Sequence, residues 1–282
     1  MPDPKLQALY GLKYNPFLPA IPVEDLWRPP GVDTFFFRVE TLLIDGGFAL
    51  LTGDPGLGKS KVSQLLAHRL AQLRDVVIGV MERPQSALGD FYRELGELFG
   101  VDLKPANRYG GFKALRARWR GHVKSTLFRP VLLIDEAQEV DTACLSEIRL
   151  LGSANFDSEC LLTTVLCGDS RLPERFRARE LLPLGSRTHT RLVLEPLSRE
   201  DMRAFLDHLL DKAGAPHLMS EPLKNALAEH SAGNPRVLTS FAAELLAEAA
   251  ARNLAVLDEQ LYMDLYAKPA RLRKTPPPRP QA

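Results

Sequence analysis

A glycine-rich segment early in the chain has the residue types that bind a phosphate chain. It comprises Gly53, Asp54, Pro55, Gly56, Leu57, Gly58, Lys59 and Ser60. Its glycines allow successive backbone N–H groups to turn toward one anion at the start of a helix, where the helix dipole favours negative charge. Lys59 is spaced to reach the β- and γ-phosphates, and the Ser60 hydroxyl to bind Mg²⁺. The segment predicts a site for a nucleoside triphosphate; the alternative is an ordinary glycine-rich turn.

Two carboxylates downstream are candidates for the other half of this site. After Pro130, the apolar run 131–134 ends in Asp135 and Glu136. A short continuous apolar run is typical of a buried parallel strand, which presents its last residues at the carboxyl edge of the sheet. There we expect Asp135 to hold Mg²⁺ and Glu136 to polarise the attacking water. A strand that runs into an acidic helix cap is the alternative, and the phosphate-binding segment favours the catalytic interpretation.

Apolar runs and amphipathic stretches indicate the elements that position these residues. Strands are expected at 48–52, 75–81, 131–135, 160–168 and 190–194. Helices are expected near 34–44, 61–70, 87–99, 111–127 and 142–151. Strands that alternate with helices predict an α/β fold, in which helices cover both faces of a parallel sheet in three layers. The predicted site lies at the carboxyl edge of this sheet.

Changes in composition divide the chain into four zones. They are an irregular Pro-rich leader at 1–30, a nucleotide-binding α/β domain at 31–195, a helical lid at 196–266 and a basic Pro-rich tail at 267–282. Helices of the lid are expected at 202–213, 221–231, 235–251 and 257–266, the first opened by a cap at Ser198. We expect the leader to wrap a surface, and the lid to depend on the sheet domain for stability.

The composition is that of an intracellular enzyme of moderate size. The chain has 282 residues, 45% of them hydrophobic, and a net charge of +1 that favours no particular partner. No apolar stretch approaches the roughly 18 residues that span a bilayer, and no charged-then-apolar leader opens the chain. We therefore expect a cytoplasmic protein with no membrane partner. Because Cys144, Cys160 and Cys167 are odd in number and lack metal-ligand spacing, we expect buried thiols.

Two basic clusters are candidates for contact with nucleic acid. The first surrounds Trp119 on an expected helix and comprises Lys113, Arg116, Arg118, Arg120 and Lys124. The second is in the tail and comprises Lys268, Arg271, Arg273, Lys274 and Arg279. Such clusters neutralise nucleic-acid phosphates in many proteins. The alternatives are a solvated helix face and a solubilising tail, and the tail is also a candidate tether for a protein partner.

Five motifs together resemble those of the AAA+ ATPases. They are the phosphate-binding segment, the strand that ends in Asp135 and Glu136, the strand that ends in Gly168 and Asp169, the pair Ser186-Arg187, and Gly233-Asn234-Pro235-Arg236. The opening Tyr10-Gly11-Leu12-Lys13-Tyr14-Asn15-Pro16-Phe17 resembles the ExeA-like branch, which includes transposition helpers of the TniB and TnsC kind. The resemblance covers residues 10 to 265. It implies a P-loop NTPase sheet with a C-terminal helical lid, and ATP as the nucleotide.

The resemblance also implies roles for residues outside the phosphate-binding segment. Arg236 would contact the γ-phosphate of the same subunit's ATP, because a guanidinium stays charged and binds phosphate in a bidentate way. Asp169, with Ser170 as an alternative, stands at the position of a polar sensor. Arg187 stands at the position of an arginine finger that acts on a neighbouring subunit, so that hydrolysis depends on assembly. The competing candidates for this finger are Arg175, Arg177, Arg179 and Arg191.

The function implied is that of a transposition helper. Such ATPases form ATP-dependent homo-oligomers, as rings or filaments, on double-stranded DNA, mark target sites and recruit or activate a transposase. The length of the chain and its tail favour this group over ExeA-type proteins, which carry a membrane span and a wall-binding domain after the ATPase part. A secretion-assembly or protein-remodelling ATPase that needs no DNA is the alternative, and a nucleotide switch with little turnover is a third.

Overall fold

Two compact units make up the part of the chain that the structure, a computed structural model, describes. The described residues are 4–82, 87–103 and 107–266. The sheet unit contains residues 20–197 and 234–236, and the helical unit contains residues 4–19, 198–233 and 237–266. The leader is thus divided between the two units. The five basic residues predicted in the tail lie outside the described residues.

The sheet unit is built on five parallel strands. They are β1 (Gly47–Gly53), β2 (Ile78–Met81), β3 (Val131–Ile134), β6 (Thr163–Gly168) and β7 (Thr188–Leu194), in the spatial order β2-β3-β6-β1-β7. In this register Thr52 pairs with Gly168, and Ile134 with Leu166. The carboxyl ends of β1, β6 and β3 therefore meet at one edge, as the sequence predicts.

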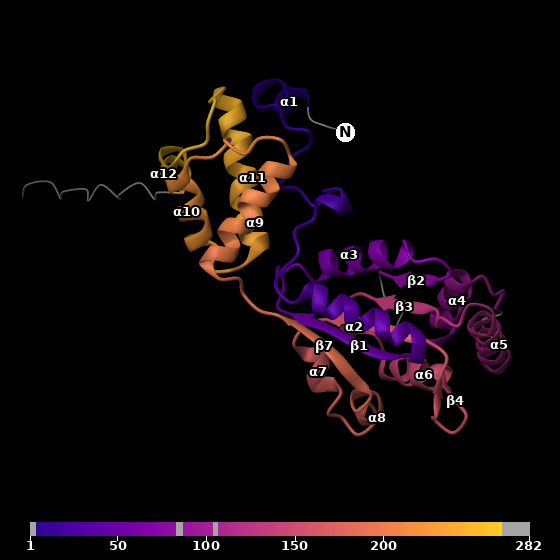
Figure 1. The fold of residues 1–282 in the computed structure, drawn as a ribbon. Helices are drawn as coiled ribbons and strands as arrows, with labels where there is room; N and C mark the ends of the chain where they lie inside the picture. Colours follow the sequence, from indigo (N-terminus) through magenta and orange to yellow (C-terminus); the bar gives the residue numbers. More distant parts are fainter. Residues whose placement is uncertain (1–3, 83–86, 104–106, 267–282) are drawn as a thin grey trace, which may run out of the picture. The chain divides into compact units, whose positions relative to one another are not determined.

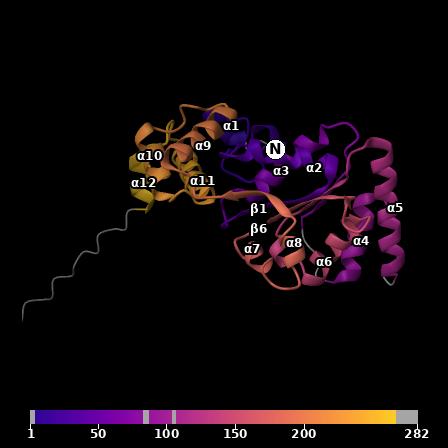
Figure 2. The ribbon, with the colours of Figure 1, turned by 60° about the horizontal axis from the view of Figure 1, so that its bottom comes forward.

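Helices cover both faces of this sheet, which confirms the predicted three-layer α/β fold (Figures 1 and 2). One face carries α2 (Val32–Asp45) and α3 (Lys59–Ala71). The other carries α4 (Leu88–Phe99), α5 (Arg108–Thr126), α6 (Thr142–Gly152) and the short α7 (Arg171–Arg175) and α8 (Leu182–Gly185). Successive side chains of a strand point to opposite faces of the sheet. Ala49 and Leu51 therefore pack in the core cluster shared with α2 and α3, and Leu50 packs in the cluster shared with α4 to α8.

A hairpin precedes β6, and the sequence did not predict it. The strand expected from residue 160 begins at Thr163, while β4 (Ser153–Ala154) pairs antiparallel with β5 (Glu159–Cys160). The apolar run continues from Cys160 into β6, so composition gave no sign of the break. Of the three thiols expected to be buried, Cys144 and Cys167 are, whereas Cys160 at the foot of this hairpin is half-exposed. That expectation was wrong for Cys160.

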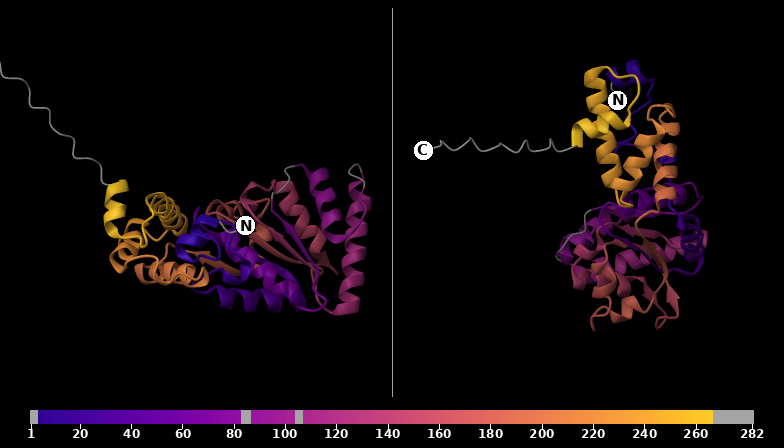
Figure 3. Two further views of the ribbon diagram at one scale, coloured as in Figure 1. Left: turned by 90° about the horizontal axis from the view of Figure 1, so that it is seen from above. Right: turned by 90° about the vertical axis from the view of Figure 1, so that its left-hand side faces the viewer.

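The helical unit packs its C-terminal helices together with the start of the chain (Figures 1 and 3). Its helices are α1 (Pro4–Tyr10), α9 (Arg199–Lys212), α10 (Glu221–His230), α11 (Pro235–Arg252) and α12 (Glu259–Tyr266). As predicted, Ser198 caps α9 by accepting from the backbone N–H of Asp201 at 3.0 Å. Helix α1 was not predicted, because seven residues are too few for a clear period. Among the described residues, no helix is long and apolar enough to cross a membrane.

Candidate active site

The glycine-rich segment connects β1 to α3 at the carboxyl edge of the sheet, as the sequence predicts. Gly56 and Gly58 have φ angles of 90° and 95°, in the left-handed region that favours glycine. A Cβ atom on Gly56 would lie 2.4 Å from Asn234 Oδ1, so packing also excludes a side chain there. Both the backbone conformation and the packing therefore require glycine at position 56.

The Gly-Asn-Pro-Arg segment is bound directly to this loop. Asn234 Nδ2 donates to the carbonyl oxygen of Pro55 at 3.1 Å, and the backbone N–H of Arg236 donates to that of Gly56 at 3.2 Å. Asn234 Oδ1 in turn accepts from the N–H of Arg236 at 3.0 Å. The structure thus brings Arg236, which is 180 residues downstream of Gly56 in the sequence, next to the phosphate-binding loop.

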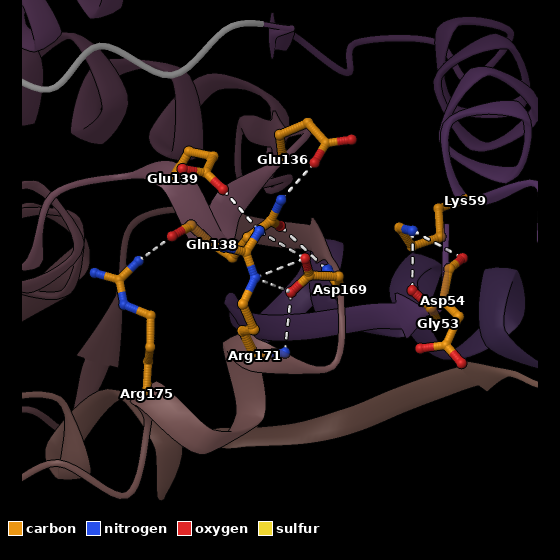
Figure 4. A network of polar contacts seen from close by, with 9 residues as sticks. All are labelled: Gly53, Asp54, Lys59, Glu136, Gln138, Glu139, Asp169, Arg171 and Arg175. Carbon is orange, nitrogen blue, oxygen red and sulfur yellow. Dashed lines mark hydrogen bonds and ion pairs between the residues drawn. The ribbon is translucent and has the colours of Figure 1, made fainter. Parts of the chain in front are cut away.

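Lys59 carries the positive charge of the loop. Its side chain bends back over the loop, where Nζ donates to the carbonyl oxygens of Gly53 at 2.9 Å and Asp54 at 3.2 Å (Figure 4). The residue is 7% exposed, and these two acceptors are neutral carbonyl oxygens, which do not neutralise its charge. Ser60 lies exposed in the first turn of α3. A buried ammonium, a glycine loop and a helix N-terminus together fit a triphosphate.

The acidic pair lies at the same edge, directly after β3. The backbone N–H of Asp135 donates to Met81 O at 3.0 Å, which extends the pairing of β3 with β2 by one residue. Asp135 is half-buried and its Oδ1 accepts from the N–H of Glu136 at 3.0 Å, whereas Glu136 is exposed with a φ of 49°. At this edge of the sheet, Asp135 is thus half-buried and Glu136 lies at the surface.

Cys167 on β6 shows how closely these groups gather. Burial raises the pKa of its thiol, and the negative charge of Asp135 raises it further while the positive charge of Lys59 opposes the rise. The charges of Asp135 and Lys59 therefore both act on this side chain of the central strand. Because the buried thiol stays protonated at neutral pH, Cys167 packs in the core and is not a candidate nucleophile.

The donors present fit a magnesium ion that is shared with the nucleotide. Among the described residues, no group of three or more His, Cys, Asp or Glu side chains is arranged to hold a metal alone. Mg²⁺ usually takes one or two protein oxygens and completes its shell with substrate phosphates and water. The Ser60 hydroxyl and the Asp135 carboxylate are donors of that kind. When bound, the ion would neutralise charge on the phosphates.

Gln138, to which the sequence gave no role, joins the acidic pair to β6. It lies in the short 3₁₀ helix η2 (Ala137–Glu139) and is 7% exposed. Its Nε2 donates to Glu136 Oε2, and its Oε1 accepts from the backbone N–H of Asp169 at 3.1 Å (Figure 4). Both ends of the amide are therefore used. The only signal in the sequence is an amide two residues after the candidate base.

Asp169, the candidate sensor, is held in an ion-pair network. Arg171 Nε donates to both of its carboxylate oxygens, at 2.8 and 3.1 Å, and Arg171 Nη2 lies 2.7 Å from Oδ2 and 2.8 Å from Glu139 Oε1 (Figure 4). The bonds from Arg171 lower the pKa of Asp169, so its carboxylate stays ionised at neutral pH. Sequence reasoning missed Arg171 and Glu139, because charged surface residues carry no signal of their partners.

Arg187, the candidate finger, lies at the opposite edge of the sheet. It immediately precedes β7, whose residue Thr188 pairs with Phe48 at the start of β1. From Phe48 to Gly53 the strand advances five residues, or about 16 Å at about 3.3 Å per residue. The guanidinium of Arg187 donates to Asp157 at 2.5 and 3.3 Å. The structure therefore does not bring Arg187 to the phosphate-binding loop of its own chain.

The competing arginines differ in what they contact. Arg175 donates to the carbonyl oxygens of Gln138 and Val140, at 2.5 and 2.8 Å, and so fastens α7 to the turn after β3. Arg191 donates to Thr188 O at 2.8 Å. Arg177 and Arg179 are exposed between α7 and α8. The first two guanidinium groups thus have a structural use, and the other two are open to solvent.

The basic cluster on α5 is not one surface. Arg116 donates to the carbonyl oxygens of Leu150, Leu151 and Ser153, which end α6, so it stabilises the packing of the two helices. The other four residues, Lys113, Arg118, Arg120 and Lys124, are exposed. At about 100° per residue, Lys113, Arg120 and Lys124 fall within about 40° of one another around the helix, and Arg118 lies at least about 120° away. We call these three residues the α5 stripe.

Comparison with known sequences finds a domain family and a curated relative that resemble this chain. The AAA domain family matches residues 44–176, from the end of α2 to α7. The general secretion pathway protein A of Aeromonas hydrophila is 32% identical over 211 residues, which make up 73% of this chain and 38% of that protein. The chain thus spans well under half the length of this curated relative.

Solved structures share the fold at low sequence identity. Cdc6p of Pyrobaculum aerophilum has a TM-score of 0.64 at 15% identity, over 86% of this chain and 67% of that one. The Aeropyrum pernix ORC2 protein, in ADPNP–ADP complexes, has a TM-score of 0.67 at 14% identity, over 92% and 72%. The Aeropyrum pernix ORC1 protein in complex with DNA has a TM-score of 0.63 at 19% identity, over 89% and 68%. These likenesses establish the fold.

Proposed function

Because the chain is an ATPase with an AAA domain and the AAA+ fold, we propose that it hydrolyses ATP between copies of itself, as a homo-oligomer. The position of Arg187 carries this proposal. A finger about 16 Å along the sheet from its own loop can supply charge only to another subunit's nucleotide. The charge that develops on the phosphoryl oxygens then lacks a counter-charge until two copies dock.

The other roles follow from positions around the loop. The loop amides and Lys59 bind the β- and γ-phosphates, Ser60 and Asp135 hold Mg²⁺, and Glu136 polarises the attacking water. Arg236 contacts the γ-phosphate within the same chain, which its backbone bond to Gly56 supports. Asp169 acts as the polar sensor. Its backbone N–H donates to Gln138, which also contacts Glu136, so Asp169 is linked to the candidate base.

The test of this proposal is ATP turnover per subunit as a function of protein concentration. If the active site forms between two copies, turnover per subunit rises with protein concentration and then saturates. If each active site lies within one chain, turnover per subunit is independent of protein concentration. Electron microscopy of the same samples, with ATP and with ADP, shows whether the active state is an oligomer. Turnover that stays constant over a 100-fold dilution would contradict the proposal.

Duplex DNA is the partner that we propose for the assembly, in the role of a transposition helper that selects a target and recruits or activates a transposase. The α5 stripe supports this, because three exposed cations on one helix face can follow a phosphate backbone. The DNA named with the Aeropyrum pernix ORC1 structure shows that this fold is used on DNA in another protein. Phosphate contacts carry no base information, so binding should be salt-sensitive and nearly independent of sequence.

Replacing the α5 stripe by alanine, at Lys113, Arg120 and Lys124 together, is expected to weaken DNA binding. Three lost phosphate contacts reduce the slope of log affinity against log salt concentration by about 2.7, at about 0.9 per contact. Arg118→Ala is the control for position, since it removes one positive charge from another side of the same helix and should change the slope by less than any one residue of the stripe. Fluorescence anisotropy with a labelled duplex at several salt concentrations measures both. An unchanged slope in the triple variant would exclude the stripe from the DNA interface.

Secretion assembly is the second candidate function, and the 32% identity to the general secretion pathway protein A favours it. A secretion-assembly ATPase would be stimulated by a protein partner, a transposition helper by duplex DNA, and a nucleotide switch by neither. Turnover measured at one protein concentration, with and without a duplex of random sequence, distinguishes stimulation by DNA from the other two outcomes. Stimulation by DNA that disappears in the α5 stripe variant would favour the helper role.

Removing the amide of Gln138 is expected to slow hydrolysis without weakening ATP binding. Gln138→Ala frees Glu136 from its hydrogen bond, and misplacing a catalytic group by about 1 Å costs up to about 100-fold in rate. We expect kcat to fall between about 10- and 100-fold with KM unchanged. In a Glu136→Gln background the same substitution should cost less, because the part of its effect that acts through Glu136 has already been lost. Equal losses in both backgrounds would mean that Gln138 does not act through Glu136.

A further inference from the structure

The Asp169 carboxylate lies at the carboxyl edge of the sheet, beside the phosphate-binding loop. Asp169 directly follows Gly168, which pairs with Thr52 across two parallel strands that are about 4.8 Å apart. Thr52 in turn directly precedes Gly53, whose carbonyl oxygen accepts from Lys59 Nζ at 2.9 Å. Asp169 therefore begins about one strand spacing from the loop whose backbone holds Lys59.

A negative charge at this position acts on any anion that Lys59 binds. Hydrogen bonds from Arg171 lower the pKa of Asp169 most, and the positive charge of Lys59 also lowers it. Lys59 is thus near enough for its charge to reach Asp169, and a phosphate held by Lys59 brings negative charge to the same place. Because the Asp169 side chain is only 16% exposed, water screens the repulsion between this carboxylate and a phosphate weakly. An uncompensated carboxylate at position 169 would therefore oppose the binding of a triphosphate.

Arg171 supplies the positive charge that offsets Asp169. Its Nε donates to both carboxylate oxygens, its backbone N–H donates to Oδ1 at 2.9 Å, and its Nη2 lies 2.7 Å from Oδ2 (Figure 4). The same Nη2 also contacts Glu139, but that carboxylate is 57% exposed, so water already screens its charge. Removing the guanidinium therefore leaves its largest uncompensated charge at Asp169.

We infer that Arg171 is a positioning residue that lets the Asp169 carboxylate lie beside the terminal phosphate, and that this ion pair sets the preference of the chain for ATP over ADP. This role of Arg171 rests on the proposed function, since it needs the β- and γ-phosphates to lie against Lys59. ATP carries more negative charge than ADP, so a carboxylate that has lost its guanidinium repels ATP more strongly. Arg171 itself contacts no phosphate in this arrangement and acts through Asp169.

Arg171→Gln tests this role, because glutamine removes the charge and retains an amide that can donate to the carboxylate. The dissociation constant of a non-hydrolysable ATP analogue should rise by about fivefold or more, and that of ADP by less than about twofold. Displacement of a fluorescent ADP analogue from the full chain, with Mg²⁺ and at low salt, measures both constants. Arg177→Gln is the matched control. It removes the same charge from the exposed turn between α7 and α8, and it should change neither constant.

Asp169→Asn separates compensation of charge from a structural role of Arg171. Asparagine keeps an Oδ1 atom that can accept from the backbone N–H of residue 171, and it removes the negative charge. In the Arg171→Gln background it should return the affinity for the ATP analogue to within about twofold of the wild type, because no uncompensated charge remains. If Arg171 only braces the start of α7, the double variant will bind the analogue no better than Arg171→Gln does.

The outcomes separate this role of Arg171 from the function on which it rests. If the wild type binds neither nucleotide, both the proposed function and the role of Arg171 are wrong. If the wild type binds both and Arg171→Gln weakens them equally or not at all, only the role of Arg171 is wrong. A loss confined to the ATP analogue and reversed by Asp169→Asn supports it, whether or not turnover depends on protein concentration.

Discussion

Replacing Arg187 by alanine is expected to lower ATP turnover at saturating protein concentration by about 10³-fold or more, and to leave ATP binding by the isolated chain unchanged. An arginine finger contributes about 10³ to 10⁵ in rate, because it stabilises charge that develops only in the transition state. A 10³-fold loss corresponds to about 4 kcal/mol of transition-state stabilisation. Steady-state turnover and binding of a fluorescent ATP analogue measure the two quantities.

Two sets of controls make this expectation specific to Arg187. Arg177→Ala and Arg179→Ala remove the same charge from the exposed turn between α7 and α8, and we expect them to retain most of the activity. Mixing Arg187→Ala with Lys59→Ala protein should restore part of the turnover. The first variant supplies an intact phosphate-binding loop and the second an intact finger to the same interface. A mixture no more active than its components would contradict catalysis between subunits.

Replacing Glu136 by glutamine is expected to lower turnover by about 10²- to 10⁴-fold, the usual contribution of a general base, while ATP still binds. Glutamine has nearly the same shape, so the loop and Asp135 should be undisturbed. Because bound ATP would then persist, the variant should remain assembled in ATP for much longer than the wild type does. Rapid-quench measurement of hydrolysis and light scattering of the same samples test both expectations.

Glu139→Gln is the matched control for that experiment. Glu139 lies three residues further along the chain, is also exposed, and contacts Arg171 rather than the position of the attacking water. Its loss should loosen the ion pair at Asp169 and reduce turnover far less than the loss of Glu136. Normal hydrolysis by the Glu136→Gln variant would show that another group polarises the water.

The sequence alone determined the half of the site that depends on local structure. Glycines at 53, 56 and 58 set the path of the loop, and a continuous apolar run set the strand that delivers Asp135. Parallel strands then place their carboxyl ends at one edge, so two segments more than 70 residues apart meet without any further information. Lys59, Asp135 and Glu136 lie at this edge, where the sequence predicts them.

Only the tertiary structure decided which charged side chains have partners. Arg116 was a candidate for DNA contact and Arg175 for the finger, yet each donates to carbonyl groups more than 30 residues away in the sequence. Arg187 is paired with Asp157, 30 residues away, and Gln138 joins the neighbouring Glu136 to Asp169, which is 31 residues from Gln138. A guanidinium or amide can donate to a carbonyl, a carboxylate or a phosphate. Its partner is therefore the acceptor that the packed helices and strands bring within reach. Residue type and spacing in the sequence do not identify that acceptor.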